Sequence, residues 1–84
     1  MKILQTSHEK NICGKQVKKL RNKLGMAQVD LAEALNVDYG FKFEQSDISE
    51  IERKARGIRD YELKAISIIL NVSPGDLLDP DFEP

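Results

Sequence analysis

Two helical patterns of apolar residues, separated by only three residues, constrain the fold of this chain more than any other feature. The first pattern places apolar side chains at positions i, i+4, i+7 and i+11, namely Cys13, Val17, Leu20 and Leu24. This spacing predicts an amphipathic helix over residues 11–24, which Gly25 ends because glycine is favoured just after a helix C-terminus. A second helix is predicted over residues 28–35. Because only residues 25–27 join the two helices, they must be close neighbours in space.

Three further helices are predicted downstream. The third covers residues 45–54, and the fourth begins near Asp60 and ends at Asn71. The fifth begins after Ser73, which is followed by proline at the first helical position and by an acidic residue three positions on. No strand of consequence is predicted. The sequence therefore predicts an all-α fold, a compact five-helix domain that opens with a helix-turn-helix.

The segments outside the helices are predicted to be loops and tails. Residues 38–43 form an extended loop in which Phe41 or Phe43 anchors the chain to the core. The domain organisation is a flexible N-terminus, a helical domain and a frayed C-terminal tail, at residues 1–10, 11–78 and 79–84.

The length of the chain limits how it can be stabilised. With 84 residues and one cysteine, Cys13, it forms a single small core and no internal disulfide, so a reducing compartment and a partner subunit are expected. No run of apolar residues approaches the roughly 20 that cross a bilayer, and the N-terminus lacks the apolar stretch of a secretory signal. We expect a cytoplasmic protein with no membrane association.

Charge is distributed in four blocks of alternating sign, although the total is only −1. Residues 1–26 carry +6 and residues 53–59 carry +4, whereas residues 27–52 and 60–84 are acidic. The two basic blocks are predicted to form separate surface patches that a polyanion could use. Lysine and arginine on solvated helix faces give the same pattern without a partner, so charge alone leaves both interpretations open.

The third predicted helix has a short polar face. Setting Ile48, Ile51 and Ala55 toward the core turns four side chains outward and leaves Gln45 at the N-terminal edge. The four outward side chains are Ser46, Ser49, Glu50 and Arg53.

Several motifs, in order and with the right spacing, resemble the XRE family of phage-repressor and Cro-like helix-turn-helix domains. They are residues 20–21, 25–28, 31–37, 48–53, 60–63 and 70–78. The resemblance covers about residues 14–78 and implies a lambda-repressor-like DNA-binding domain. Such domains are commonly homodimers whose third helix enters the major groove. Here the apolar residues Leu77, Leu78 and Phe82 are expected to pack across the two-fold axis.

The resemblance also implies a role for each matching position. The base-reading positions are Gln45, Ser46, Ser49 and Glu50. The phosphate-binding positions are Gln28, which also braces the third helix, and Arg53, Lys54 and Arg56. Arg21 and Glu52 match a structural salt bridge between the first and third helices. At three positions this chain differs from the family pattern: Lys54 replaces a usual glycine, Ile58 replaces a frequent proline, and Ala27 replaces a threonine or serine cap. The missing cap costs about 1 kcal/mol, which Asp30 partly offsets through the helix dipole. The turn before the third helix, residues 38–43, is also about six residues longer than the minimal one.

No arrangement of residues indicates catalysis, a cofactor or a metal. Glu50 and Glu52 point about 200° apart on a helix, and His8 has no metal-ligating neighbours in sequence. The sequence therefore predicts a sequence-specific, DNA-binding transcriptional regulator, not an enzyme. It would act as a repressor that binds double-stranded operator DNA as a homodimer. The alternative is a protein-interaction module, such as an antitoxin or adaptor, that binds a protein partner through the acidic surface of the third helix.

Overall fold

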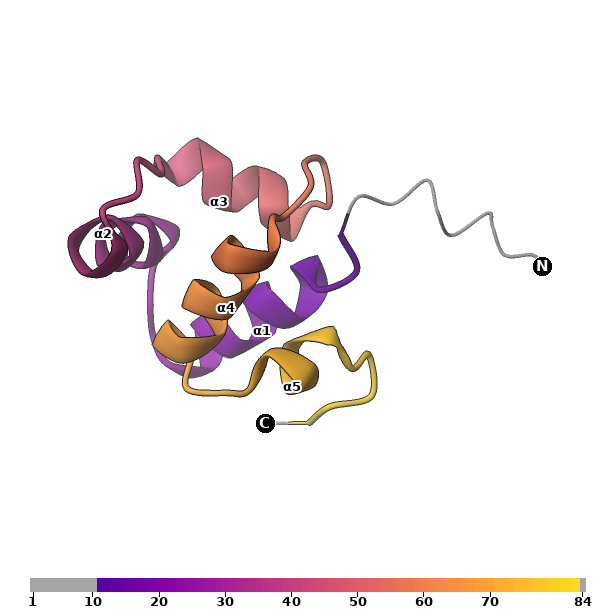
Figure 1. The fold of residues 1–84 in the computed structure, drawn as a ribbon. Helices are drawn as coiled ribbons and strands as arrows, with labels where there is room; N and C mark the ends of the chain where they lie inside the picture. Colours follow the sequence, from indigo (N-terminus) through magenta and orange to yellow (C-terminus); the bar gives the residue numbers. More distant parts are fainter. Residues whose placement is uncertain (1–10, 84) are drawn as a thin grey trace.

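Five helices account for the regular structure of residues 11–83, the part of the chain that the computed structural model describes (Figure 1). They are α1 (Gly14–Lys23), α2 (Gln28–Tyr39), α3 (Gln45–Glu52), α4 (Asp60–Ile69) and α5 (Pro74–Leu78). No strand occurs within residues 11–83, so the prediction of a small all-α domain with five helices is confirmed. The expected flexible segment 1–10, His8 included, lies outside the described residues.

The N-terminus of α1 is fixed against the C-terminal end of α3 by Asn11. Its side-chain oxygen accepts a hydrogen bond from the Gly14 amide at 2.9 Å, and its Nδ2 donates to the carbonyl of Arg56 at 2.8 Å and of Ile51 at 3.4 Å. The predicted start of the helix at residue 11 is therefore wrong by three residues: Cys13 is the N-cap, and Asn11 lies before the helix with its side chain bonded to the first helical amide.

Gly14 allows this contact to be close. A Cβ atom at this position would collide with the carbonyl oxygen of Ile51 and would lie 3.1 Å from both the Glu52 carbonyl oxygen and Cγ of Lys54. Backbone rather than flexible side chain thus fills the space beside Gly14. The absence of a side chain here sets the distance between α1 and α3.

The second helix is four residues longer than predicted. Asn36 was expected to end it, but its side chain bonds across to the following loop: Oδ1 accepts from the Phe43 amide and Nδ2 donates to the Phe43 carbonyl, both at 2.8 Å. The last residue of the helix is instead Tyr39, and Gly40 forms the C-cap in the left-handed conformation, with φ 71°. The loop predicted at residues 38–43 is therefore shortened to residues 40–44.

Four helices begin with the same capping interaction. An acidic side chain at the third helical position accepts a hydrogen bond from the backbone amide that precedes the helix. The acceptors are Asp30, Asp47, Glu62 and Asp76, at distances of 2.9, 2.8, 3.0 and 3.4 Å. Ala27 has no side-chain acceptor, as expected from the sequence. The bond from its amide to Asp30 nevertheless provides half of a capping box in α2. Ser73 completes the box in α5 by accepting from the Asp76 amide at 3.0 Å.

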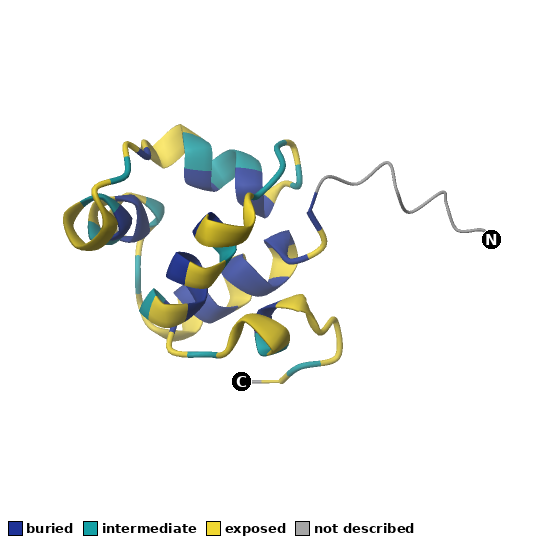
Figure 2. Ribbon diagram, in the orientation of Figure 1, coloured by how far each residue is buried: buried dark blue, intermediate teal, exposed yellow. Residues whose placement is uncertain are grey.

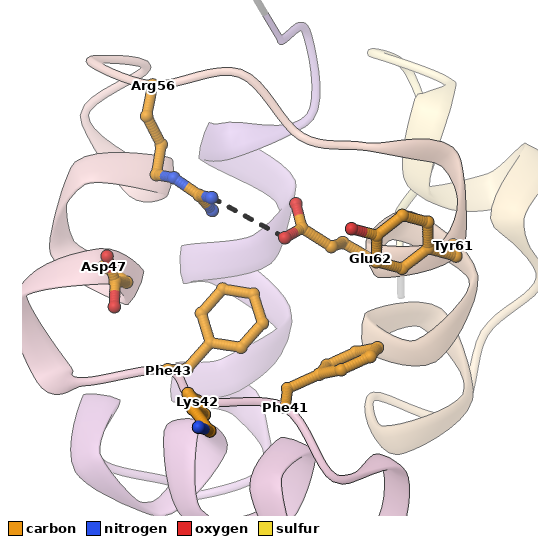
Figure 3. Close-up of a pocket in the computed structure, with 7 residues that line it drawn as sticks. All are labelled: Phe41, Lys42, Phe43, Asp47, Arg56, Tyr61 and Glu62. Atoms are coloured by element: carbon orange, nitrogen blue, oxygen red, sulfur yellow. Dashed lines mark ion pairs between the residues drawn. The ribbon is translucent and has the colours of Figure 1, made fainter.

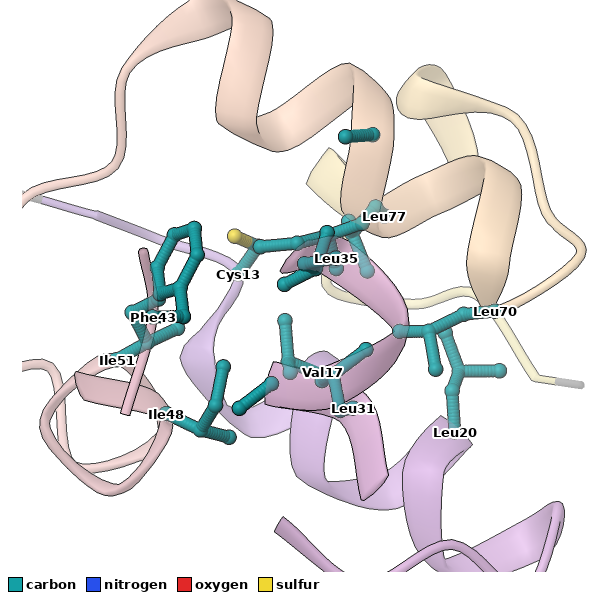
Figure 4. Packing of buried hydrophobic residues seen from close by; sticks show 13 residues of the cluster. Cys13, Val17, Leu20, Leu31, Leu35, Phe43, Ile48, Ile51, Leu70 and Leu77 are labelled. Carbon is teal, nitrogen blue, oxygen red and sulfur yellow. The ribbon is translucent and has the colours of Figure 1, made fainter. Parts of the chain in front are cut away.

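The core lies between the inward faces of all five helices, and the polar faces point outward (Figures 2 and 4). Phe43 anchors the loop in this core with 8% exposure, whereas Phe41 lies at its edge. Two apolar residues expected inside are on the surface instead. Leu24 is 51% exposed because α1 has already ended at Lys23, and Ala55 is exposed because α3 ends at Glu52.

The C-terminal tail is attached to α1, not frayed as expected. Nε2 of the buried Gln16 donates to the carbonyl oxygens of Asp79 and Phe82 at 2.9 and 3.0 Å. Lys19 forms an exposed salt bridge with Glu83 at 3.0 Å. These bonds join residues more than 60 positions apart in the sequence, so they could not be anticipated from local patterns.

Replacing Gly14 by alanine should destabilise the protein. The added methyl group forces α1 away from the α3 backbone, at a cost of about 1–3 kcal/mol in the free energy of unfolding. Gly75 is the matched control: its Cβ would meet only the Ser73 hydroxyl at an ordinary 3.7 Å, so alanine there should be neutral or slightly stabilising. Urea denaturation of the two variants measures the difference, and equal stability would contradict the role given to Gly14.

The thiol of Cys13 should be protected in the folded state. Burial raises the pKa of this thiol from 9.0 to about 11, although a backbone hydrogen bond acts in the opposite direction. At pH 8 the folded protein then carries roughly a hundredfold less thiolate than the unfolded chain. We expect alkylation by iodoacetamide to be at least that much slower without urea than with it.

The same pKa shift makes folding stability dependent on pH. Because the folded-state pKa is the higher one, the stability contributed by the neutral thiol is complete below pH 9 and is lost as the pH rises from 9 toward 11. A Cys13→Ala variant should lack this part of the alkaline destabilisation in urea titrations.

Candidate nucleic-acid interface

The outer face of α3 carries the four predicted base-reading residues. Gln45 and Ser46 are exposed, and Ser49 and Glu50 are partly exposed, while Ile48 and Ile51 on the opposite side are fully buried. Figure 2 shows this division along α3. The surface is thus a short row of polar side chains on a helix whose other face is fixed in the core.

A buried ion pair holds the C-terminal end of α3. Arg21 Nε donates to Glu52 Oε2 at 2.6 Å and Nη2 to Oε1 at 3.1 Å, and the two side chains are only 8% and 3% exposed. Nη1 of Arg21 also donates to the carbonyl of Met26, at 2.6 Å, in the connection to α2. One guanidinium therefore joins α1, the α1–α2 connection and α3.

Gln28 extends this network to the outer face of α3. Its Nε2 donates to Glu52 Oε1 at 3.0 Å, and its Oε1 accepts from Nε2 of Gln45 at 3.2 Å. The side chain thus braces both ends of α3 from the first turn of α2. One hydrogen on Nε2 is not used by the bond to Glu52, and it is the one that could reach a phosphate.

Arg53 and Lys54 follow α3 directly. Nε of the exposed Arg53 donates to the Ser49 hydroxyl at 3.3 Å, which links a predicted phosphate ligand to a predicted base reader. Lys54 has φ 61°, the left-handed conformation that glycine adopts without strain. A lysine in this conformation costs about 1–2 kcal/mol, which a glycine at this position would avoid.

Arg56 is directed inward instead of standing free on the surface (Figure 3). Its guanidinium lies 3.6 Å from Glu62 and 5.5 Å from the centre of the Phe43 ring, and its side chain is 24% exposed. It lines a shallow hollow of about 260 Å³ between the 40–44 loop and α4, together with Phe41 and Tyr61. Arg59 also pairs with the buried Glu62, at 3.6 Å.

These contacts change the distribution of positive charge that the sequence suggested. Glu62 partly neutralises Arg56 and Arg59, which are half of the second basic block. Of the other two, Arg53 is exposed, and Lys54 lines the same hollow as Lys15 and Lys18 of α1. Separate patches were expected from the sequence, and for Lys54 this expectation is wrong. The approach of Lys54 to α1 joins residues more than 30 positions apart, so local patterns could not indicate it, whereas Arg59 and Glu62 are only three residues apart.

The acidic residues of α3 also have internal roles. Asp47 caps the helix through the Glu44 amide, and Glu52 is committed to Arg21 and Gln28. Glu44, which is exposed, and Glu50, which is partly exposed, remain on the outside of the helix.

The residues expected at a dimer interface are not equally accessible. Leu77 is fully buried in the core and cannot meet a second subunit, so this part of the expectation is wrong. Leu78 is 40% exposed, and the partly buried Phe82 lines an apolar hollow of about 380 Å³ with Leu24 and Val72.

Comparison of the chain with family models, with curated proteins and with solved structures returned no match. Within residues 11–83, no cluster of three histidine, cysteine or acidic side chains is arranged to hold a metal ion. None of the helices in that range has the length and apolar character needed to span a membrane.

Replacing Arg21 by methionine should destabilise the protein by about 3–5 kcal/mol, because Glu52 would remain buried without its counter-charge. Replacing Glu52 by leucine in the same protein should recover part of this loss, since no charge is then left unpaired. The exposed pair of Lys19 and Glu83 is the control, and Glu83→Gln should change stability by less than about 1 kcal/mol. Chemical denaturation of the three variants tests this ranking, which fails if the single Arg21 variant is as stable as the double one.

Proposed function

We propose that this chain is a sequence-specific DNA-binding transcriptional regulator with a lambda-repressor-like helix-turn-helix fold of the XRE type. Two copies would bind operator DNA, each with α3 in the major groove. The observation that carries the proposal is the row of polar side chains on α3, on a helix braced by Arg21 and Gln28. A helix that reads base edges must be held rigidly and must present short polar groups.

The residue types on α3 suit base recognition. Gln45 has an amide that can bond bidentately to adenine, Ser46 and Ser49 can donate to or accept from any base, and Glu50 can accept from the amino group of cytosine. The hydrogen bond that Gln45 Nε2 donates to Gln28 Oε1 would orient the Gln45 side chain before DNA binds. Preorganisation of this kind lowers the entropic cost of binding.

Arg53 and Lys54 are the phosphate ligands we favour. Both follow α3 directly, and cations there would meet the backbone beside the bases that α3 reads. Gln28 has one amide hydrogen left for a phosphate. Arg56, expected from sequence to bind phosphate as well, is assigned instead to holding α4 against the loop through Glu62 and Phe43.

A dimer fits this function because two copies related by a two-fold axis read two half-sites of a palindrome. Leu24 and Leu78 are among the exposed apolar residues available for such a contact, whereas Leu77 is buried.

Selection of binding sites from a random duplex library tests the proposal. At about 50 mM salt, and again near 150 mM to remove electrostatic background, we expect an enriched palindrome with half-sites about one helical turn apart. No enrichment at either salt concentration would overturn the DNA-binding function. It would favour the protein-interaction alternative, in which Glu44 and Glu50 face a basic partner.

Two variants should separate base reading from phosphate binding. Ser46→Ala should change the preferred base at one position of the site, because it removes one hydrogen-bonding group. Arg53→Gln should weaken binding to all sequences alike and reduce the slope of log affinity against log salt by about one unit. Library selection and salt titration of each variant measure both effects, and a selective change of preference in Arg53→Gln would contradict this division of roles.

A further inference from the structure

A basic groove runs along the exposed side of α1, next to the C-terminal end of α3. The hollow has a volume of about 770 Å³, and its lining includes Lys15, Lys18, Lys19 and Asn22 of α1, with Glu52 and Lys54. We call it the α1 groove. Nothing in the function proposed above requires a groove at this position.

The charges around the α1 groove favour an anion. Four lysines line it against a single acidic residue, Glu52, whose carboxylate is bound to Arg21 and Gln28. Of the four, Lys19 is neutralised by Glu83 at 3.0 Å. Lys15 and Lys18 are exposed, one helical turn apart, on the same face of α1.

The α1 groove is continuous with the surface of α3. Glu52 is the last residue of α3, and Lys54 follows it in the left-handed conformation, with its Cγ placed beside Gly14 at the start of α1. The close approach permitted by Gly14 and held by Asn11 thus brings the two basic blocks of the sequence to one place. An extended anion that leaves the C-terminal end of α3 would enter the groove directly.

We propose that the α1 groove binds the phosphodiester backbone of DNA flanking the bases that α3 reads. This inference rests on the function proposed above and adds a second contact outside the half-site. Each DNA strand carries a negative charge at every nucleotide, and Lys15 and Lys18, one turn apart on α1, supply two exposed cations for such a row of charges. Lysine is suited to this contact because it acts as a point charge without demanding one geometry.

The test uses the selected binding site in two duplexes, one cut back to the half-sites and one extended by about five base pairs at each end. Wild-type protein is compared with a Lys15→Gln, Lys18→Gln double variant. The control variant is Lys64→Gln, which changes an exposed lysine of α4 outside the groove. All substituted side chains are exposed, and thermal melts followed by circular dichroism check that each variant is folded.

On the extended duplex the double variant should bind roughly tenfold or more weakly than wild type at about 100 mM salt, with a salt slope lower by nearly two units. On the short duplex the loss should be much smaller, and the preferred bases should stay the same. The Lys64 variant should match wild type on both duplexes.

Two outcomes would overturn the inference. One leaves the proposed function intact, and the other removes it as well. If wild type binds the selected site but the double variant keeps its affinity and salt slope on the extended duplex, the groove does not contact DNA, and the reading role of α3 stands. If wild type binds neither duplex, the proposed function fails together with the inference.

Discussion

The contact between α1 and α3 sets the position of every other feature of the candidate interface. At one end of this contact, Gly14 lies against the backbone of Ile51 and Glu52, and the Asn11 side chain bonds to the carbonyl of Arg56. At the other end, the Arg21 guanidinium reaches Glu52 and the connection to α2. Moving α3 relative to α1 would therefore require breaking buried polar bonds or creating a steric clash. A small core with no disulfide gains a defined geometry from such bonds, even where their net contribution to stability is modest.

Local patterns predicted the helices of this chain but not all of their ends. The five helices follow from apolar spacing and from capping residues such as Ser73, which act within three or four positions. Two of the errors occur where a side chain bonds to backbone outside its own helix. Asn36 bonds to Phe43 instead of ending α2, and Gln16 holds the tail through the carbonyls of Asp79 and Phe82. An asparagine or glutamine has the same neighbours in sequence whether its side chain ends a helix, faces solvent or bonds to remote backbone. Sequence alone could therefore not distinguish these roles.

In the candidate site, too, some features could be predicted from the sequence and others could not. The outward face of α3 follows from helical geometry, so its polar residues could be named from the sequence, and the Arg21–Glu52 pair came from the resemblance. The placement of the cations could not be named, because charge along the chain does not show which side chains meet. Arg56 turns to Glu62, and Lys54 turns to α1. These positions depend on tertiary contacts that no local pattern records.

The sign of the charge on α3 is the remaining physical question. The helix contains three acidic residues and Glu44 precedes it, so this segment approaches a polyanion only if those charges are offset. Asp47 and Glu52 are engaged within the protein, the latter with a buried arginine. Glu44 and Glu50 then stand against Arg53 and Lys54, so α3 and the residues that follow it contribute little net attraction. In the proposed complex with DNA, affinity would therefore have to come from elsewhere, and the lysines of α1 are the nearest source. There α3 would supply discrimination between sequences, because an acidic side chain is repelled by DNA wherever it finds no amino group, while α1 would supply an attraction that does not depend on sequence.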